Sequence, residues 1–271
     1  MTRNFIRPKK SLGQHFLKDQ DIAERIASTI EGFAALPILE VGPGTGMLTG
    51  CLVRKGYDLH AVEIDRDAVS ILRRQFPTLT GRIVEGDFLR MPVCDLFNGQ
   101  FCIIGNYPYN ISTQIFFRLI ELRDRVPCCC GMLQREVAMR LSAPPGSRAG
   151  GILSVILQAW YDVEYLFTVD ETVFDPPPRV KSGVIRAVRN TRTQLPCSES
   201  RLLAVIKTAF NQRRKTLRNS LKPLLGNNFA HYSDPIFSRR PEELSVDDFI
   251  NMIIEYGMDD GAASSPPPKT N

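Results

Sequence analysis

The 271-residue sequence contains no apolar run of the roughly 18 residues that a membrane-spanning helix needs. Its seven cysteines show no C-x-x-C pairing, and three of them are consecutive in the apolar stretch "PCCCGML". We therefore expect reduced thiols in a protein core, with no disulfide framework and no metal site. A cytoplasmic protein that does not insert into a membrane is the class that these absences favour.

Acidic residues are missing from two stretches of the chain. Residues 1–18 and residues 201–222 each contain at least five lysines and arginines and no aspartate or glutamate. Together these positive charges exceed the net charge of +5, so the rest of the chain is acidic overall. Basic patches of this kind usually meet phosphate groups, although either stretch alone is equally compatible with a solvated helix face.

Strand-like and helix-like segments alternate over the first half of the chain. Short apolar runs predict strands at residues 36–42, 57–65, 81–87, 101–106 and 127–133. Amphipathic segments predict helices between them at residues 45–56, 66–76 and 112–124. Strands and helices that alternate at this spacing predict an α/β fold, with a parallel sheet covered on both faces.

The second half of the chain changes in character. A helix is expected around residues 153–160, followed by strands at 163–169 and 182–188 that pair as an antiparallel hairpin at the edge of the sheet. After a linker at residues 190–199 the strand signals stop, and helices are predicted at 200–225 and 241–256. We expect one domain over residues 1–190, a small all-helical domain over residues 199–257, and a disordered tail over residues 258–271.

The first predicted strand ends in a glycine-rich loop, "EVGPGTG", which opens a helix. Gly42 and Gly44 let the backbone approach a ligand closely, and a helix N-terminus favours anionic groups. Dinucleotide-binding loops follow the pattern G-x-G-x-x-G, but Met47 stands in the place of the last glycine. The tighter G-x-G-x-G spacing is more typical of enzymes that bind S-adenosyl-L-methionine, while the loop alone is also compatible with a structural turn.

Acidic residues stand at the ends of the next two strands. Glu63 ends the second strand, where a carboxylate can accept hydrogen bonds from both hydroxyls of a ribose. Asp87 ends the third strand, where it can accept from the amino group of an adenine that lies beside Phe88. Each carboxylate alone could belong to a surface turn. Their order at successive strand ends favours a cofactor site, because open sheets bind ligands at that edge.

The fourth strand ends in "GNYPYNIS", residues 105–112. The exocyclic amine of adenine is a poor nucleophile because its lone pair is delocalised into the ring. The side-chain oxygen of Asn106 and the backbone carbonyl of Pro108 can each accept one amine hydrogen, and Tyr109 offers a face on which the base can stack. An N-x-P-Y stretch at a strand end therefore predicts the methylation of an amino group on a nucleic-acid base.

The sequence resembles the ribosomal RNA adenine dimethylase family over residues 7–256. The resemblance is carried, in order, by "KKSLGQHFLKD", "ILEVGPGTG", "AVEIDRDAV", "EGDFL", "GNYPYNIS", "MLQREVAMRL", "FDPPPRVKSGVI" and "AFNQRRKTLRN". It implies a Rossmann-like class I methyltransferase domain with a mostly parallel seven-stranded sheet, followed by a helical C-terminal domain. The implied reaction is dimethylation of two adjacent adenines in the terminal hairpin of 16S rRNA, late in small-subunit assembly.

The resemblance also implies roles for single residues. The family pattern places the methyl donor against His15, Leu17, Gly42, Glu63, Asp87 and Asn106. His15 replaces the asparagine expected in "GQNFL", which leaves its contact open. Tyr107 stands where leucine is common, a change that we expect to matter little. Phe174 is expected to stack on the second face of a flipped adenine, with core packing as the alternative.

Basic residues near the later motifs are expected to contact RNA phosphates, because structured RNA is recognised mainly through its shape and backbone. These residues are Arg179, Lys181, Arg213, Arg214, Lys215 and Arg218. The expected partner is 16S rRNA within the immature small subunit, bound by a monomer.

Three other functions remain open from the sequence. A large-subunit rRNA methylase of the antibiotic-resistance type has the same catalytic stretch, but the long "AFNQRRKTLRN" region favours the small-subunit branch. A non-catalytic nucleic-acid-binding protein is disfavoured by the intact set of Gly42, Glu63, Asp87 and Asn106. A nicotinamide-dependent oxidoreductase is disfavoured by Met47.

Overall fold

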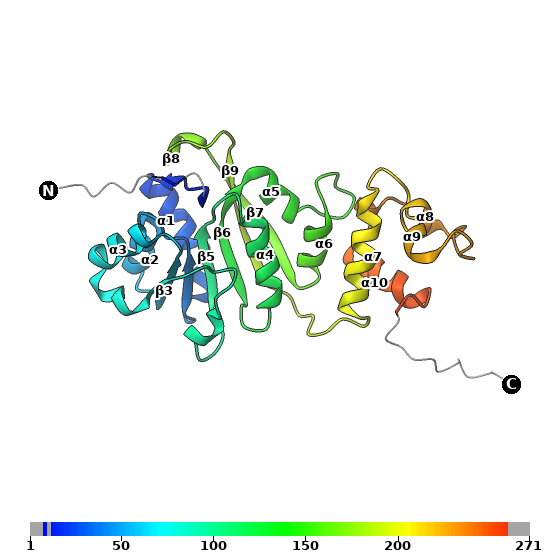
Figure 1. Ribbon diagram of the computed structural model, residues 1–271, viewed down its shortest axis with the longest axis horizontal. Helices are drawn as coiled ribbons and strands as arrows, with labels where there is room; N and C mark the ends of the chain where they lie inside the picture. The colour runs from blue at the N-terminus through cyan, green and yellow to red at the C-terminus, as the bar shows by residue number, and fades with distance from the viewer. Residues whose placement is uncertain (1–7, 10–11, 260–271) are drawn as a thin grey trace. The chain divides into compact units, whose positions relative to one another are not determined.

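The computed structural model describes residues 8–9 and 12–259 of the chain (Figure 1). The chain divides into two compact units. Unit 1 comprises Met1–Ser142 and Trp160–Asn190, and unit 2 comprises Ala143–Ala159 and Thr191–Asn271. No helix within the described residues is long and apolar enough to cross a membrane.

Unit 1 is built on a seven-stranded sheet with the strand order β4-β3-β2-β5-β6-β9-β7. Its strands are β2 (Ile38–Val41), β3 (Leu59–Glu63), β4 (Ile83–Glu85), β5 (Cys102–Asn106), β6 (Cys128–Gln134), β7 (Tyr161–Val169) and β9 (Ser182–Arg189). The strands from β4 to β6 pair in parallel, whereas β9 pairs antiparallel with both β6 and β7. This confirms the α/β class, the mostly parallel sheet and the antiparallel hairpin at its edge.

The helices of unit 1 are α1 (Gln20–Ser28), α2 (Met47–Arg54), α3 (Arg66–Gln75), α4 (Ser112–Glu121) and α5 (Arg135–Leu141). Side chains of the first three helices form one apolar cluster with alternate residues of the sheet, among them Cys128, Cys130 and Met132. Helix α1 is not among the helices predicted from the sequence; Asp19 caps it by accepting a hydrogen bond from the Ile22 amide. All seven cysteines are free thiols, and six of them are buried.

A second, two-stranded sheet brings the N-terminal segment against a distant loop. Strand β1 (Phe16–Leu17) pairs antiparallel with β8 (Phe174–Asp175), so that Phe16 lies opposite Asp175 and Leu17 lies opposite Phe174. The Lys18 amide extends this contact by donating to the Val173 carbonyl at 2.9 Å. These bonds hold the residues that precede β1 beside the main sheet.

Within its described residues, unit 2 contains helices joined by turns and loops, and no strand. It contains α6 (Ile152–Gln158), α7 (Glu199–Asn211), α8 (Leu217–Ser220), α9 (Lys222–Leu225) and α10 (Val246–Glu255). The helix expected over residues 200–225 is interrupted, because α7 ends at Asn211 and residues 212–216 form a loop. The helix expected over residues 241–256 begins later, at Val246, after a short 3-10 turn; Ser245 and Asp248 form the capping box at its start.

The boundary between the units differs from the one expected from the sequence. Residues 143–159, which the sequence places in the first domain, group with unit 2 because α6 packs against α7 and α10. The apolar side of α6, which includes Leu153 and Leu157, is buried. From residue 260 onward, the tail expected to be disordered lies outside the described residues.

Candidate active site

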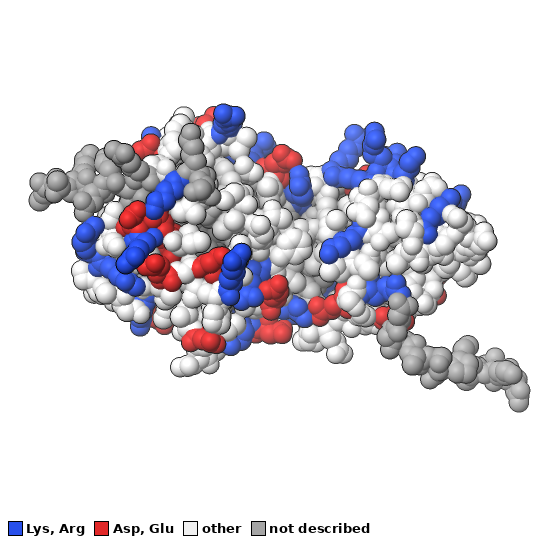
Figure 2. Space-filling view, viewed as in Figure 1, with Lys and Arg blue, Asp and Glu red and all other residues white. Residues whose placement is uncertain are grey.

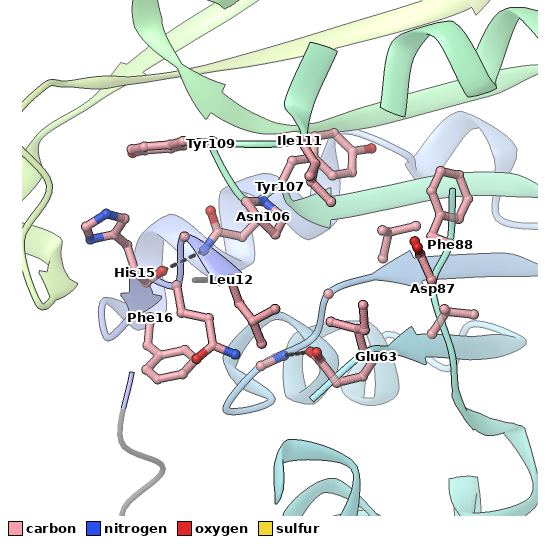
Figure 3. Close-up of a pocket in the computed structure, with 18 of the residues that line it drawn as sticks. Leu12, His15, Phe16, Glu63, Asp87, Phe88, Asn106, Tyr107, Tyr109 and Ile111 are labelled. Atoms are coloured by element: carbon pink, nitrogen blue, oxygen red, sulfur yellow. Dashed lines mark hydrogen bonds between the residues drawn. The ribbon is translucent and has the colours of Figure 1, made fainter. Parts of the chain in front are cut away.

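The strand ends of unit 1 surround one pocket (Figure 3). Residues that follow β2, β3, β4 and β5 line it together with the segment Leu12–Phe16. The pocket contains about 710 Å³ of empty space, part of it open to solvent. Parallel strands place their carboxyl ends at the same edge of a sheet, so the motifs spread along the sequence meet here.

The glycine loop forms the floor of the pocket. Gly42 and Gly44 both have positive φ angles, of 70° and 56°, which side chains other than glycine rarely adopt. A Cβ atom on Gly44 would lie 3.1 Å from the Phe16 ring, and one on Gly42 would lie 3.6 Å from the Pro108 ring. The loop thus lies against the N-terminal segment on one side and the "NYPY" loop on the other, and the two glycines let these segments approach it closely.

Glu63 is held by backbone amides before any ligand binds. Its side chain is buried; Oε2 accepts a hydrogen bond from the Gly44 amide at 3.0 Å, and Oε1 accepts one from the Asp65 amide at 2.8 Å. Burial raises the pKa of Glu63, which these two amides partly offset. A carboxylate oxygen can accept more than one hydrogen bond, so each oxygen can still receive a donor from the pocket.

Asp87 and Phe88 follow the end of β4. The Asp87 Oδ1 atom accepts a hydrogen bond from the Leu89 amide at 2.9 Å, while Phe88 is almost fully buried. Ile64, which follows Glu63, also lines the pocket and is 52% exposed. An exposed apolar side chain beside two fixed carboxylates suits a flat ring that carries polar groups at its edge. The sequence does not single out Ile64, because an isoleucine after a strand resembles a core residue.

The Asn106 amide has a defined orientation. Its Nδ2 atom donates a hydrogen bond to the His15 backbone carbonyl at 3.2 Å. Since a carbonyl can only accept, the nitrogen must face His15, and the oxygen lies on the side of Tyr109 (Figure 3). No described residue donates to this oxygen, so it is available to a hydrogen-bond donor from the substrate.

Pro108 and Tyr109 continue the same loop. The Pro108 carbonyl accepts a hydrogen bond from the Ile111 amide at 3.2 Å, which leaves its second lone pair free. The Tyr109 hydroxyl lies 2.5 Å from the Ser182 hydroxyl, and burial raises the pKa of Tyr109. Its ring lies beside that of His15, with the centroids 5.4 Å apart. The aromatic face is therefore fixed next to the two acceptors.

Ionic contacts hold the N-terminal segment at the pocket. The Lys9 Nζ atom pairs with Asp65 at 2.6 Å and with Asp67 at 2.8 Å. The Gln14 side chain donates to the second oxygen of Asp65 at 3.1 Å, and the His15 Nδ1 atom donates to the Pro176 carbonyl at 2.8 Å. Lys9 belongs to the basic stretch 1–18, for which phosphate contacts are expected. It pairs with two carboxylates instead and so holds the N-terminal segment in place.

A model of the family described as ribosomal RNA adenine dimethylase matches residues 6–256. The chain belongs to the ribosomal RNA adenine dimethylase family. The ribosomal RNA small subunit methyltransferase A of Porphyromonas gingivalis is 61% identical to it over 251 residues, which cover 92% of this chain and 97% of that protein. The protein of the same name from Parabacteroides distasonis is 59% identical and covers 92% of this chain and 94% of its own length.

A solved structure has the same fold. The crystal structure of a dimethyladenosine transferase from Plasmodium falciparum superposes with a TM-score of 0.75, covering 90% of this chain and 98% of that one at 22% identity. The two proteins therefore share their fold over nearly the whole length of this chain.

Two residues expected at the adenine dimethylase site lie elsewhere. Leu17 and Phe174 face each other across β1 and β8, are only 4% and 1% exposed, and belong to the apolar core. Neither lines the pocket, whereas Phe16 does. Side chains alternate along a strand, so the pairing that turns Phe16 to the pocket turns Leu17 away from it. The structure thus favours core packing for Phe174 and places the Leu17 side chain in the core as well, while a contact of the Leu17 backbone with the cofactor stays a prediction.

The other expected cofactor and catalytic residues line the pocket. These are His15, Gly42, Gly44, Glu63, Asp87, Phe88, Asn106, Pro108 and Tyr109. Gln14, Phe16 and Ile111 line it as well and are not singled out by the sequence. Gln14 and Phe16 reach the pocket through the path of the N-terminal segment, whereas Ile111 belongs to the loop between β5 and α4.

Five of the six basic residues expected to meet RNA lie on loops of the two units. In unit 1, Arg179 and Lys181 are exposed, and Lys181 pairs with Asp170 at 3.0 Å. In unit 2, Arg214 and Lys215 are exposed on the loop after α7. Figure 2 shows a group of positive side chains on the upper side of unit 2. Arg213 is half-buried and donates to the Arg148 carbonyl, so it has a structural contact of its own.

Arg218 of α8 is exposed as well, and its Nε atom donates to the Tyr232 carbonyl at 2.8 Å. This bond uses one of the five N–H donors of the guanidinium group. The remaining donors can face a phosphate, so Arg218 is compatible with the role expected from the sequence.

Glu40 is a buried carboxyl next to the pocket. It lies in β2, is 1% exposed, and its Oε2 atom has no hydrogen-bond partner within the described residues. Burial, together with the negative charge of Glu63, raises the pKa of Glu40 to about 8. The folded protein therefore holds a proton on Glu40 at a pH at which the unfolded chain has released it.

We predict that Glu40→Gln stabilises the protein progressively as the pH rises. The folded pKa lies above the ordinary value of 4.5, so the contribution of the Glu40 proton is complete below about pH 4.5 and diminishes as the pH rises towards about 8. Glutamine has the same shape and does not titrate. The difference in Tm between variant and wild type should grow over this range, by the equivalent of up to about 5 kcal/mol, and then level off.

The matched control is Glu85→Gln, because Glu85 is exposed at the end of β4. It removes the same carboxyl group from an exposed position, so a pH-dependent difference that Glu40→Gln shows beyond this control belongs to the buried site. Thermal unfolding monitored by circular dichroism provides both curves. A constant offset for Glu40→Gln over the same range would show that Glu40 ionises normally in the folded protein.

Proposed function

We propose that this protein dimethylates the exocyclic amino groups of two adjacent adenines in the 3′-terminal hairpin of 16S rRNA, using S-adenosyl-L-methionine. The observation that supports this most directly is the placement of the Asn106 oxygen and the Pro108 carbonyl at the pocket that Glu63 and Asp87 line. The small-subunit enzymes with which the chain shares up to 61% identity support the choice of RNA.

The residues of the pocket fit the methyl donor. Glu63 has an acceptor position free on each oxygen for a ribose hydroxyl, and Asp87 can accept from the adenine amino group between Ile64 and Phe88. Gly42 and Gly44 line the same pocket, and without side chains their backbone can approach the amino-acid end of the molecule closely. When bound, the donor supplies a methyl group on a positively charged sulfur, which makes that carbon electrophilic.

The protein itself positions the amine. Asn106 Oδ1 and the Pro108 carbonyl each accept one amine hydrogen, which draws the nitrogen lone pair out of conjugation with the ring. Because His15 fixes the Asn106 nitrogen, the oxygen cannot turn away from the substrate. Tyr109, fixed through Ser182, provides a rigid stacking face for the flipped base. The proton displaced from the amine leaves to solvent.

The second unit and the basic loops serve the RNA in this proposal. Arg214, Lys215 and Arg218 in unit 2, and Arg179 and Lys181 in unit 1, are exposed and can meet phosphates. The substrate is the immature small subunit in the cytoplasm, and the enzyme acts as a monomer. Two transfers per adenine require the product cofactor to leave between rounds, and the partly open pocket is compatible with that exchange.

Incubation with labelled S-adenosylmethionine and undermethylated ribosomal subunits tests the function. We expect label on two adjacent adenines of 16S rRNA in the small subunit and none in the large subunit. Mapping of the modified bases by mass spectrometry gives the positions. Label confined to 23S rRNA would assign the protein to the large-subunit branch, and no transfer to either subunit would contradict enzymatic function.

Asn106→Ala should lower the kcat of methyl transfer by about 10²-fold or more. The amine loses one of its two acceptors, and the loop loses its bond to His15. Binding of the methyl donor, measured by calorimetry, should change little. The matched control is Asn98→Ala, since Asn98 is exposed in the same unit and does not line the pocket. Near-normal turnover by Asn106→Ala would remove the proposed mechanism.

The salt dependence of affinity tests the phosphate contacts proposed for unit 2. Changing Arg214 and Lys215 together to alanine should lower the slope of log affinity for small subunits against log salt, by roughly 0.7–0.9 for each phosphate that the variant no longer neutralises. Arg213 is left unchanged because it donates to the Arg148 carbonyl. Changing Arg66 and Arg74 of α3 removes the same charge from exposed positions in unit 1. Equal slopes for both double variants would show that the loop does not bind phosphates specifically.

A further inference from the structure

Tyr107 stands between Asn106 and Pro108 but points the other way. Its ring is 1% exposed and lies on the side opposite to the Asn106 amide (Figure 3). The two acceptors of the proposed reaction therefore flank a residue whose side chain is part of the protein core.

The ring lies flat on two glycines. Gly105 of β5 and Gly131 of β6 are opposite each other in the sheet. A Cβ atom on Gly105 would lie 2.8 Å from the ring carbon Cε1, and one on Gly131 would overlap Cε2. On another side, Phe116 of α4 meets the ring edge-on, with centroids 6.0 Å apart at 87°. A Cβ atom at either position would also meet a backbone carbonyl, of Val41 or of Gly105, so the space that the ring fills requires glycine at both positions.

The polar atoms of Tyr107 tie it to β6. Its hydroxyl donates a hydrogen bond to the Cys130 carbonyl at 2.6 Å, and its amide donates to the Met132 carbonyl at 2.9 Å. The Cys129 thiol lies 3.2 Å from the same hydroxyl oxygen. Burial raises the pKa of Tyr107 far above its ordinary value, so the hydroxyl stays protonated and remains a donor. A leucine in place of Tyr107 would keep the amide bond and lose the hydroxyl bond.

We propose that Tyr107 is a positioning residue, which sets the places of Asn106 Oδ1 and the Pro108 carbonyl by fastening their loop to β6 over the Gly105–Gly131 pair. The role of these two atoms as acceptors of the amine hydrogens rests on the function proposed above. A loop held at both the backbone and the tip of a buried side chain has little freedom to shift. Displacements of about 1 Å at a reacting group lower rates by up to about 10²-fold, so this fastening affects turnover and not only stability.

Tyr161 provides a matched control. It is a second buried tyrosine of unit 1, and its hydroxyl donates to the Val126 carbonyl at 2.8 Å, but it does not line the pocket. Tyr107→Phe and Tyr161→Phe remove the same chemical group and the same type of hydrogen bond. A purely structural role for Tyr107 predicts similar effects of the two changes on every measurement.

The experiment compares the two variants with the wild type in Tm, in kcat and KM for methyl transfer to undermethylated small subunits, and in amide hydrogen exchange. We expect similar decreases of Tm, but a fall in kcat of about tenfold for Tyr107→Phe alone, with KM for the methyl donor within about twofold. Amides of residues 106–111 should exchange faster in Tyr107→Phe only. Phe116→Leu, which loosens the ring but keeps the hydroxyl bond, should give an intermediate kcat.

The proposal is overturned if Tyr107→Phe keeps its kcat, or if kcat falls in both tyrosine variants in proportion to Tm. Unchanged exchange at residues 106–111 would overturn it as well. A wild-type protein that transfers no methyl group would contradict the proposed function instead. The exchange data would then still decide whether Tyr107 fixes the loop.

Discussion

The parallel pairing of β2, β3, β4 and β5 is the constraint on which the site depends. Backbone groups of neighbouring parallel strands pair in one direction, so all four strands deliver their last residues to the same edge of the sheet. Glu63, Asp87 and Asn106 are far apart in the sequence and converge for this reason. The parallel strand direction thus brings the site together, and the few side chains at the strand ends determine what it can bind.

The parts of the site that follow a strand could be predicted from the sequence. Strand ends are marked by a switch from apolar residues to glycine, asparagine or acid, and this switch located Gly42, Glu63, Asp87 and Asn106 correctly at the pocket. Leu17 and Phe174 could not be placed in this way. Their orientation depends on a two-residue pairing between segments more than 150 residues apart, and the pattern within either segment does not reveal which side faces the core.

Tertiary packing also decided features that local patterns missed. The amphipathic pattern of residues 200–225 predicted one helix, but the chain leaves the helix at Asn211 and exposes Arg214 and Lys215 on a loop. Residues 143–159 pack with helices that follow them by more than 40 residues, so unit 2 is discontinuous in sequence. Tyr107 shows the same limit, because the two glycines beneath its ring lie on different strands.

The two amide bonds to Glu63 have a thermodynamic consequence. Since the Gly44 and Asp65 amides fix both oxygens of the carboxylate, its torsions are already frozen in the free protein. A nucleoside that binds to this carboxylate does not have to order it. Ordering a mobile side chain on binding typically costs about 0.5–1.5 kcal/mol, and here the side chain is already ordered in the folded protein. The glycine loop therefore increases affinity indirectly, because the Gly44 amide makes Glu63 rigid before the ligand binds.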